Sequence, residues 1–205
     1  MNNPLSYQAT EYDCGPTALR NAISYLYDRE EIHPEIIKFI GLYCMDSYNQ
    51  DGEPCKNGTS SVAMAFMANW LNHYGQMRKW PIHCQVLTPD EVHVSQNSQI
   101  IAALQQGGVA IVRVTLECAH YVLLTGVDGE YVYAFDPYYN PKDYQTALVR
   151  TIHGKADQMN RMIHWNALNR EGQEDYSLGE VAKRECVLIF NTCSHAKATT
   201  MEYSI

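Results

Sequence analysis

The feature that most constrains the fold is a change of hydrophobic pattern at Gly107-Gly108. Before this pair, apolar residues mostly recur at intervals of three and four, the spacing of a helix with one buried face. After it, β-branched and aromatic runs alternate with turn residues, which is typical of strands joined by hairpins. Helices followed by an antiparallel sheet predict an α+β fold.

The clearest helix begins near Gly15-Pro16, because proline fits a first helical turn, where its missing N–H has no intrahelical partner to lose. A second long helix is expected over residues 62–73, after the N-cap candidates Thr59-Ser60-Ser61. Shorter helices are expected over residues 34–40 and 99–106. The apolar sides of the two long helices are formed by Leu19, Ala22, Ile23 and Leu26, and by Ala63, Phe66, Met67 and Trp70.

The remaining regular elements are expected to be strands. Residues 44–58 are polar and rich in turn residues, so we expect an exposed loop there, while residues 138–178 have no period that assigns them. We predict a single domain over residues 1–193, with a helical half at about 1–80, a sheet half at about 81–193, and a loose tail over 194–205. The expected strands are residues 82–87, 109–114, 120–127, 131–135 and 185–190.

Composition and charge exclude several classes of protein. With 46% hydrophobic and 19% charged residues in 205, the chain fits a globular protein and not a disordered one. Its net charge of −8 is a poor match for nucleic acid or anionic lipid. No apolar run approaches the roughly 18 residues of a membrane helix, and the first residues do not form a secretory signal. We expect a cytoplasmic protein with no nucleic-acid or membrane partner.

The seven cysteines fit that compartment, because an odd number leaves one out of a complete disulfide framework. No Cys-x-x-Cys pair occurs, and the only short pairs with metal-ligand character are Cys118-x-His120 and Cys193-x-His195. Such lone pairs usually arise by chance, so we expect neither a metal nor a cofactor. Most of the cysteines are interpreted as small buried hydrophobic residues in a reducing cytosol.

Cys14 is the exception, because it stands just ahead of the first helix in Asp13-Cys14-Gly15-Pro16. A helix N-terminus carries partial positive charge and unpaired N–H groups, both of which favour a thiolate, and the thiolate is the nucleophile. Taken alone, a small residue at a helix start with no chemistry is the simpler interpretation.

Three polar residues elsewhere in the chain favour a reactive Cys14. Gln8 lies six residues upstream, where a loop amide can turn back so that its NH₂ and the Cys14 N–H face a developing oxyanion. His120 opens one apolar strand, and Asp136 closes the next. A carboxylate beside the imidazole would hold its tautomer and orientation.

The hairpin between these strands decides whether His120 and Asp136 meet. A two-residue loop, Asp128-Gly129, would put them on opposite faces of the sheet. A three-residue loop, residues 127–129, would set them directly opposite each other with Cβ atoms about 5 Å apart, and it places Gly129 where a left-handed residue is needed. The two-residue Asp-Gly turn is the commoner expectation, but we predict the three-residue loop because it alone joins the two residues.

These motifs together resemble the bacteriocin-processing (double-glycine leader) peptidase family of papain-like cysteine proteases. The resemblance rests on the spacing of Gln8 from Asp13-Cys14-Gly15-Pro16, on the His-Tyr-Val-Leu-Leu-Thr-Gly strand from His120, and on Asp136-Pro137. It covers most of residues 8–137, and Gly58-Thr59-Ser60 also fits the family.

The resemblance implies a papain-like cysteine protease fold, in which an N-terminal helical half packs on a C-terminal antiparallel sheet. Carried over residue by residue, it implies Cys14 as nucleophile, His120 as general base and acid, Asp136 as the residue that orients His120, and Gln8 as oxyanion donor. The implied reaction is hydrolysis of a peptide or protein substrate through a thioester.

The chain departs from the family in two respects. Members are often part of membrane exporters with an ATPase, yet this sequence has neither a membrane span nor a Gly-x4-Gly-Lys-Ser/Thr phosphate loop. Residues 44–58 and 138–178 also look longer than the family's minimal domain needs. Cleavage after a double glycine therefore does not follow from the resemblance.

Four alternatives to peptide hydrolysis stay open on the sequence. Glutamine deamidation and acyl transfer of the transglutaminase type use the same thioester, because they differ in the shape of the cleft and not in the nucleophile. An inactive papain-like domain that only binds peptides would also keep the fold. In the simplest alternative, the Cys, His and Asp are structural, which requires four residues of site type to occur in order by coincidence.

Overall fold

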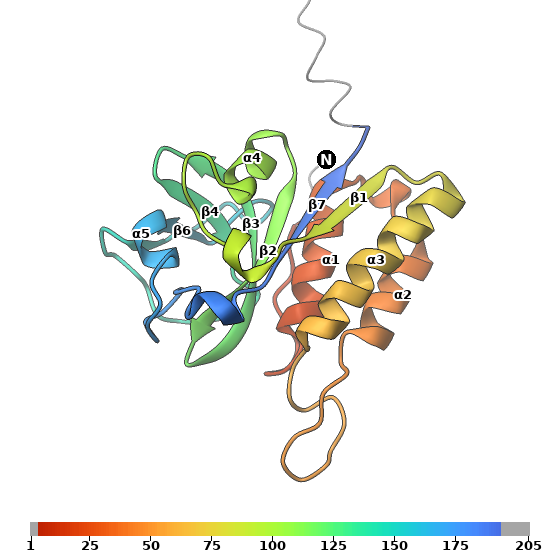
Figure 1. Ribbon diagram of the computed structural model, residues 1–205, viewed down its shortest axis with the longest axis horizontal. Helices are drawn as coiled ribbons and strands as arrows, with labels where there is room; N and C mark the ends of the chain where they lie inside the picture. The colour runs from red at the N-terminus through yellow and green to blue at the C-terminus, as the bar shows by residue number, and fades with distance from the viewer. Residues whose placement is uncertain (1–3, 194–205) are drawn as a thin grey trace, which may run out of the picture.

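The computed structural model describes residues 4–193 and shows a group of helices beside a seven-stranded sheet (Figure 1). The long helices come first: α1 (Cys14–Leu26), α2 (Pro34–Tyr43) and α3 (Ser61–Arg78). The strands are β1 (Ile82–Val86), β2 (Val109–Leu116), β3 (Cys118–Asp128), β4 (Tyr131–Phe135), β5 (Val149–Thr151), β6 (Arg161–His164) and β7 (Cys186–Asn191). The short elements are α4 (Gln99–Gln105), α5 (Trp165–Leu168) and the 3₁₀ turns η1 (Arg29–Glu31), η2 (Pro89–Glu91) and η3 (Val181–Lys183). This order confirms the expected α+β fold.

Neighbouring strands are all antiparallel, in the order β1-β7-β2-β3-β4-β6-β5. β7, the last strand of the described residues, lies between β1 and β2, so this late strand returns to the side of the helices (Figure 1). The central strands β2 and β3 are mostly buried on both faces. Their sequences are therefore nearly continuous apolar runs and lack the alternation of half-exposed strands.

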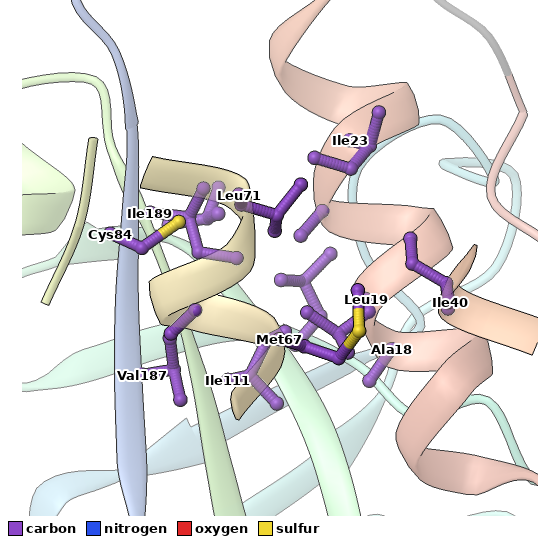
Figure 2. Packing of buried hydrophobic residues seen from close by; sticks show 14 of the residues in the cluster. Ala18, Leu19, Ile23, Ile40, Met67, Leu71, Cys84, Ile111, Val187 and Ile189 are labelled. Carbon is purple, nitrogen blue, oxygen red and sulfur yellow. The ribbon is translucent and has the colours of Figure 1, made fainter. Parts of the chain in front are cut away.

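Each face of the sheet has its own hydrophobic core, because successive side chains of a strand point to opposite sides. One core lies between the sheet and the long helices (Figure 2). The other lies on the opposite face, beneath α4, α5 and the chain that follows β4. The first core includes Leu19, Ile23, Met67, Leu71, Ile111, Val187 and Ile189, and the second includes Val112, Val122, Leu124, Ala134, Ile163 and Tyr176.

The helix α3 is longer than expected, and of the four residues predicted for its buried side only Ala63 and Met67 are buried. Its N-cap is Ser60, whose Oγ accepts a hydrogen bond from the Ala63 N–H at 3.1 Å. Phe66 is 47% exposed, although the sequence pattern assigned it to the buried side. The reason is that Phe66 and Trp70 face α2, where they contact the rings of Tyr43 and Phe39 at 5.3 and 4.9 Å. The buried side is instead formed by Ala63, Met64, Met67, Ala68, Leu71, Tyr74 and Gly75.

The hairpin between β3 and β4 differs from the prediction. Asp128 pairs with Tyr131, so the loop has two residues, Gly129 and Glu130, and the predicted three-residue loop is wrong. The predicted pairing of His120 with Asp136 is also wrong, because pairing of β3 with β4 ends at Leu123 and Phe135.

A register shift at Thr125 nevertheless puts His120 and Asp136 on the same face. From the loop back to Gly126, the paired residues of β3 and β4 keep the register that the two-residue loop sets. Continued along both strands, this register would leave His120 and Asp136 on opposite faces. Between Leu124 and Gly126 the register moves by one residue, so Leu124 pairs with Ala134. By alternation, His120 then shares the face of Leu124, and Asp136 that of Ala134.

The two segments that the sequence left without regular elements differ in structure. Residues 44–58 form an exposed loop, as expected, with a single bridge between Tyr48 and Pro54, and it projects away from the helices and the sheet (Figure 1). Residues 138–178 contain β5, β6 and α5, and their apolar side chains complete the second core. Within residues 4–193, no helix has the length and apolar character needed to cross a membrane. The predicted tail, residues 194–205, lies outside the described residues.

Candidate active site

Asp13 shapes the chain just before Cys14. Its carboxylate accepts hydrogen bonds from the N–H groups of Ala9 at 3.1 Å and Thr10 at 2.8 Å, which folds residues 9–13 into a tight loop. Its carbonyl accepts the N–H of Thr17 at 3.0 Å and so begins α1. Cys14 is therefore held in the first turn of the helix, where the local N–H groups favour a thiolate.

Cys14 is buried, with 6% of its surface exposed, and its sulfur is surrounded by hydrogen-bond donors. Burial opposes ionisation of the thiol, but the hydrogen bond and positive charge of His120 and the main-chain N–H groups of Tyr121 and Gly15 outweigh it. The pKa of Cys14 consequently lies below the ordinary thiol value of 9.0.

The Tyr121 N–H can reach Cys14 because β4 does not extend along the first part of β3. β4 pairs with β3 only as far as Leu123, so the part of β3 that precedes Leu123 has no β4 partner on that edge. The Tyr121 N–H lies in this part and helps to lower the pKa of Cys14. The early end of β4 thus opens β3 to the N-terminus of α1.

His120 forms a short hydrogen bond with Asp136, whose Oδ1 lies 2.7 Å from Nε2 of the ring. Both side chains are buried. Burial lowers the pKa of His120, yet the hydrogen bonds and charges of Asp136 and Cys14 raise it to about 9. Because Nε2 is taken by Asp136, Nδ1 is the ring nitrogen left to face Cys14.

Asp136 is fully buried and held from several sides. Burial raises the pKa of its carboxyl, but hydrogen bonds from His120, Tyr176 and the Tyr138 N–H, together with the charge of His120, bring it below 3.8. Asn160 fixes the main chain, since its Oδ1 accepts the Asp136 N–H and its Nδ2 donates to the Asp136 carbonyl, both at 2.8 Å. Sequence reasoning missed Asn160 and Tyr176, because both lie in residues 138–178, where no period marks an element.

Gln8 lies beside the site through its main chain, and its N–H donates to the Pro137 carbonyl at 2.8 Å. Its side-chain Nε2 donates to the Thr10 carbonyl at 2.8 Å. Its Oε1 is buried and has no hydrogen-bond partner in the described part of the chain. This contact pattern does not test the expected role of Gln8 as oxyanion donor, which stays a prediction.

Cys14 and His120 open onto a cleft of about 460 Å³, within the range of roughly 300–1,000 Å³ usual for ligand sites. One wall is rigid because Glu185 binds both Arg113, at 2.8 Å, and the Tyr121 hydroxyl. The other lining residues include Glu11, Tyr12, Asn57, Gly58, Thr59 and Cys118.

The start of α3 closes tightly on the start of α1. A Cβ atom at Gly15 would lie 2.3 Å from the Thr59 hydroxyl oxygen, so only glycine fits next to Cys14 without a shift of Thr59. Because Thr59 lines the cleft, this contact sets the position of one cleft wall relative to the sulfur.

No group of three or more His, Cys, Asp or Glu side chains within residues 4–193 is arranged to hold a metal ion. The chemistry that these residues offer is that of a buried thiol, an imidazole and a carboxylate in hydrogen-bonded sequence. This sequence of groups suits nucleophilic attack on a carbonyl carbon, followed by proton transfer to the leaving group.

Comparison with known proteins gives the class of protein. The chain belongs to the Peptidase_C39 like family, whose pattern matches residues 1–172. This confirms the family resemblance drawn from the motifs. A search of curated proteins gave no match. One similar solved structure is a double glycine motif protease from an AMS/PCAT transporter in complex with the leader peptide, with 13% identity, a TM-score of 0.41, and coverage of 91% of this chain and 89% of that chain.

Proposed function

We propose that this protein is a cysteine peptidase in which Cys14 is the nucleophile, His120 the general base and acid, and Asp136 the residue that orients His120. The observation that carries the proposal is the buried hydrogen-bonded row from Cys14 through His120 to Asp136. Membership in a peptidase family supports a peptide or protein as substrate.

The reaction begins with the Cys14 thiolate and the His120 imidazolium. The sulfur attacks the amide carbonyl, and the tetrahedral oxyanion is held by the Cys14 N–H and the side-chain amide of Gln8. His120 then protonates the leaving amine as the C–N bond breaks, which leaves a thioester on Cys14. Finally, neutral His120 takes a proton from water, and the hydroxide displaces the sulfur and releases the acid.

Gln8 can take this part without giving up its hydrogen bond to Thr10. Its Nε2 binds the Thr10 carbonyl, but the amide has a second hydrogen that can point to an oxyanion. The tie between the Gln8 N–H and the Pro137 carbonyl supports this role, since it fixes the Gln8 main chain next to Asp136. We also retain the cytoplasmic location as part of the proposal, on the composition and the expected reducing environment of the seven cysteines.

The test is incubation of the purified protein with a peptide library, followed by mass spectrometry of the products. Cys14→Ala should abolish turnover, and Gln8→Ala should reduce it by about 100- to 1,000-fold, the usual effect of losing one oxyanion donor. Cys118→Ala is the matched control, because Cys118 lines the same cleft and has no part in the reaction. Normal turnover by the Cys14→Ala protein would refute the mechanism.

The products also separate the proposal from its rivals. A cut in the peptide backbone supports the peptidase. A side-chain amide converted to an acid, with a mass gain of about one unit from replacing NH₂ by OH, indicates a deamidase, and a new amide indicates an acyltransferase; all three share the thioester. No product, together with a Cys14 that iodoacetamide fails to label below pH 7, would indicate a domain that only binds peptides.

A further inference from the structure

Polar groups surround the carboxylate of Asp136, and of these only His120 takes part in the proposed reaction. Its Oδ1 accepts hydrogen bonds from His120 Nε2 at 2.7 Å and from the Tyr138 N–H at 2.9 Å. Its Oδ2 accepts the hydroxyl of Tyr176 at 2.7 Å. With donors on both oxygens, the carboxylate cannot rotate about its Cβ–Cγ bond without breaking one of these hydrogen bonds.

Tyr176 is in turn bound by a buried cation. Its hydroxyl oxygen accepts a hydrogen bond from Arg161 Nε at 2.9 Å. Arg161 also donates through Nη1 to the Asn160 carbonyl at 2.9 Å, and its guanidinium lies 5.5 Å from the centre of the Tyr144 ring. Burying a guanidinium is unfavourable unless anionic or polar groups compensate it. A single hydroxyl connects this charge to Asp136.

The main chain of Tyr176 is held in an unfavourable conformation. Its φ of 65° lies in the left-handed region, which a bulky aromatic residue rarely adopts. The Tyr176 N–H donates to the Thr115 carbonyl at 2.7 Å and holds the conformation, and the residue is fully buried. Unfavourable main-chain geometry of this kind tends to occur at functional sites.

We propose that Tyr176, supported by Arg161, is a positioning residue that fixes the Asp136 carboxylate so that it holds His120 with Nδ1 toward Cys14. This inference rests on the proposed function of the same site. It gives a role to residues 138–178, since both Tyr176 and Arg161 come from that segment. Tyr176 touches no reacting atom and acts only through Asp136.

The first test measures the imidazole itself, with no substrate present. In a Cys14→Ala background, His120 faces the Asp136 carboxylate and the ring of Tyr138, whose centre lies 6.3 Å from that of the imidazole. Asp136 in turn faces the Tyr176 hydroxyl, which Arg161 binds. The His120 ring is followed by NMR against pH. Adding Tyr176→Phe should move the His120 titration toward its ordinary value of 6.5, because a freely rotating carboxylate holds the imidazolium less well.

Tyr144→Phe is the matched control. Tyr144 packs on Tyr176 with ring centres 5.6 Å apart, but its hydroxyl binds Asp175 at 2.7 Å and not Asp136. This variant removes a hydroxyl from the same aromatic pair and should leave the His120 titration unchanged. An unchanged titration in the Tyr176→Phe protein, or an equal shift in both, would overturn the proposal.

A second measurement uses the active protein. Tyr176→Phe should lower kcat by about 10- to 100-fold with little change in KM, the usual effect of removing a group that orients a reactive one. If Tyr176→Phe fails to fold, Arg161→Lys keeps the buried charge but loses the fixed Nε–H, and the same shift of the His120 titration is expected. A wild type that cleaves no peptide would refute the proposed function alone, because the NMR titration needs no activity.

Discussion

At the level of single residues, the proposed role of His120 predicts a limit to the pH range of the activity. Amide cleavage needs the Cys14 thiolate and the His120 proton together, because the amine leaves only when protonated. Activity should therefore rise with pH as Cys14 ionises, and this rise should lie below the ordinary thiol value of 9.0 because the pKa of Cys14 is lowered. Activity should fall again near pH 9, where His120 loses its proton.

The measurement is kcat/KM for peptide cleavage against pH, compared with the rate of Cys14 alkylation. Alkylation needs only the thiolate, so it should persist above pH 9 while cleavage declines. Cys118 is the internal control, because burial and the charges of Cys14 and Glu117 raise its pKa. It should react more slowly than Cys14 at neutral pH although it is more exposed. Cleavage that still rises above pH 9 would contradict the role of His120.

The residue types and their spacing were enough to predict which side chains belong together. Cys14, His120 and Asp136 were selected for their positions at the ends of a helix and two strands, and the structure places them in contact. The predicted hairpin was wrong because the loop lies at Gly129-Glu130. The register shift at Thr125, which brings His120 and Asp136 back to one face, depends on groups that are distant in sequence. The Thr125 Oγ1 donates to the Gln158 carbonyl, and the Thr125 carbonyl accepts the Tyr25 hydroxyl.

At the level of elements, the space around two helical glycines predicts opposite effects of alanine substitution on stability. Gly41 of α2 has open space where a Cβ would stand, so Gly41→Ala should stabilise the protein by up to about 1 kcal/mol through helix propensity. Gly15→Ala should instead destabilise it by about 1–3 kcal/mol, because its Cβ would overlap Thr59. Adding Thr59→Gly should recover part of that loss.

Urea unfolding of the three variants measures these changes as shifts of the midpoint. The prediction is contradicted if Gly15→Ala is as stable as Gly41→Ala, since the contact with Thr59 would then be loose enough to absorb a methyl group.

The elements themselves were predictable where they are long and periodic. α1 and α3 have enough residues for a helical period to show, and β2, β3 and β4 are β-branched and aromatic runs bounded by turn residues. β5 and β6 have three and four residues and were missed, because so few positions cannot establish a pattern. They form because Val149 and Ile163 complete a core whose other members are distant in sequence.

At the level of the whole molecule, the reactive pair affects how stability depends on pH, because stability changes wherever the folded and unfolded chains bind different numbers of protons. Folding raises the pKa of His120 from 6.5 to about 9, so its contribution is full below pH 6.5 and is lost as the pH rises to about 9. Folding lowers the pKa of Cys14 from 9.0, so its contribution is present above pH 9 and is lost as the pH falls through the folded value. A rise in pH between these values therefore reduces the contribution of His120 to stability and increases that of Cys14.

Removing the sulfur should therefore make stability more sensitive to pH. In the Cys14→Ala protein, Asp136 still raises the pKa of His120, but no thiol releases a proton to offset the one that His120 binds on folding. Its free energy of unfolding should decline more steeply than that of the wild type above pH 6.5, by at most about 1.4 kcal/mol per pH unit for one proton. Urea unfolding at several pH values between about 6.5 and 8 measures the slopes. Cys118→Ala is the control expected to follow the wild type in this range, because the raised pKa of Cys118 keeps its thiol neutral in the folded and unfolded chains alike. Parallel curves for wild type and Cys14→Ala would mean that the folded protein holds Cys14 as a neutral thiol, since only an ionised sulfur changes the proton balance.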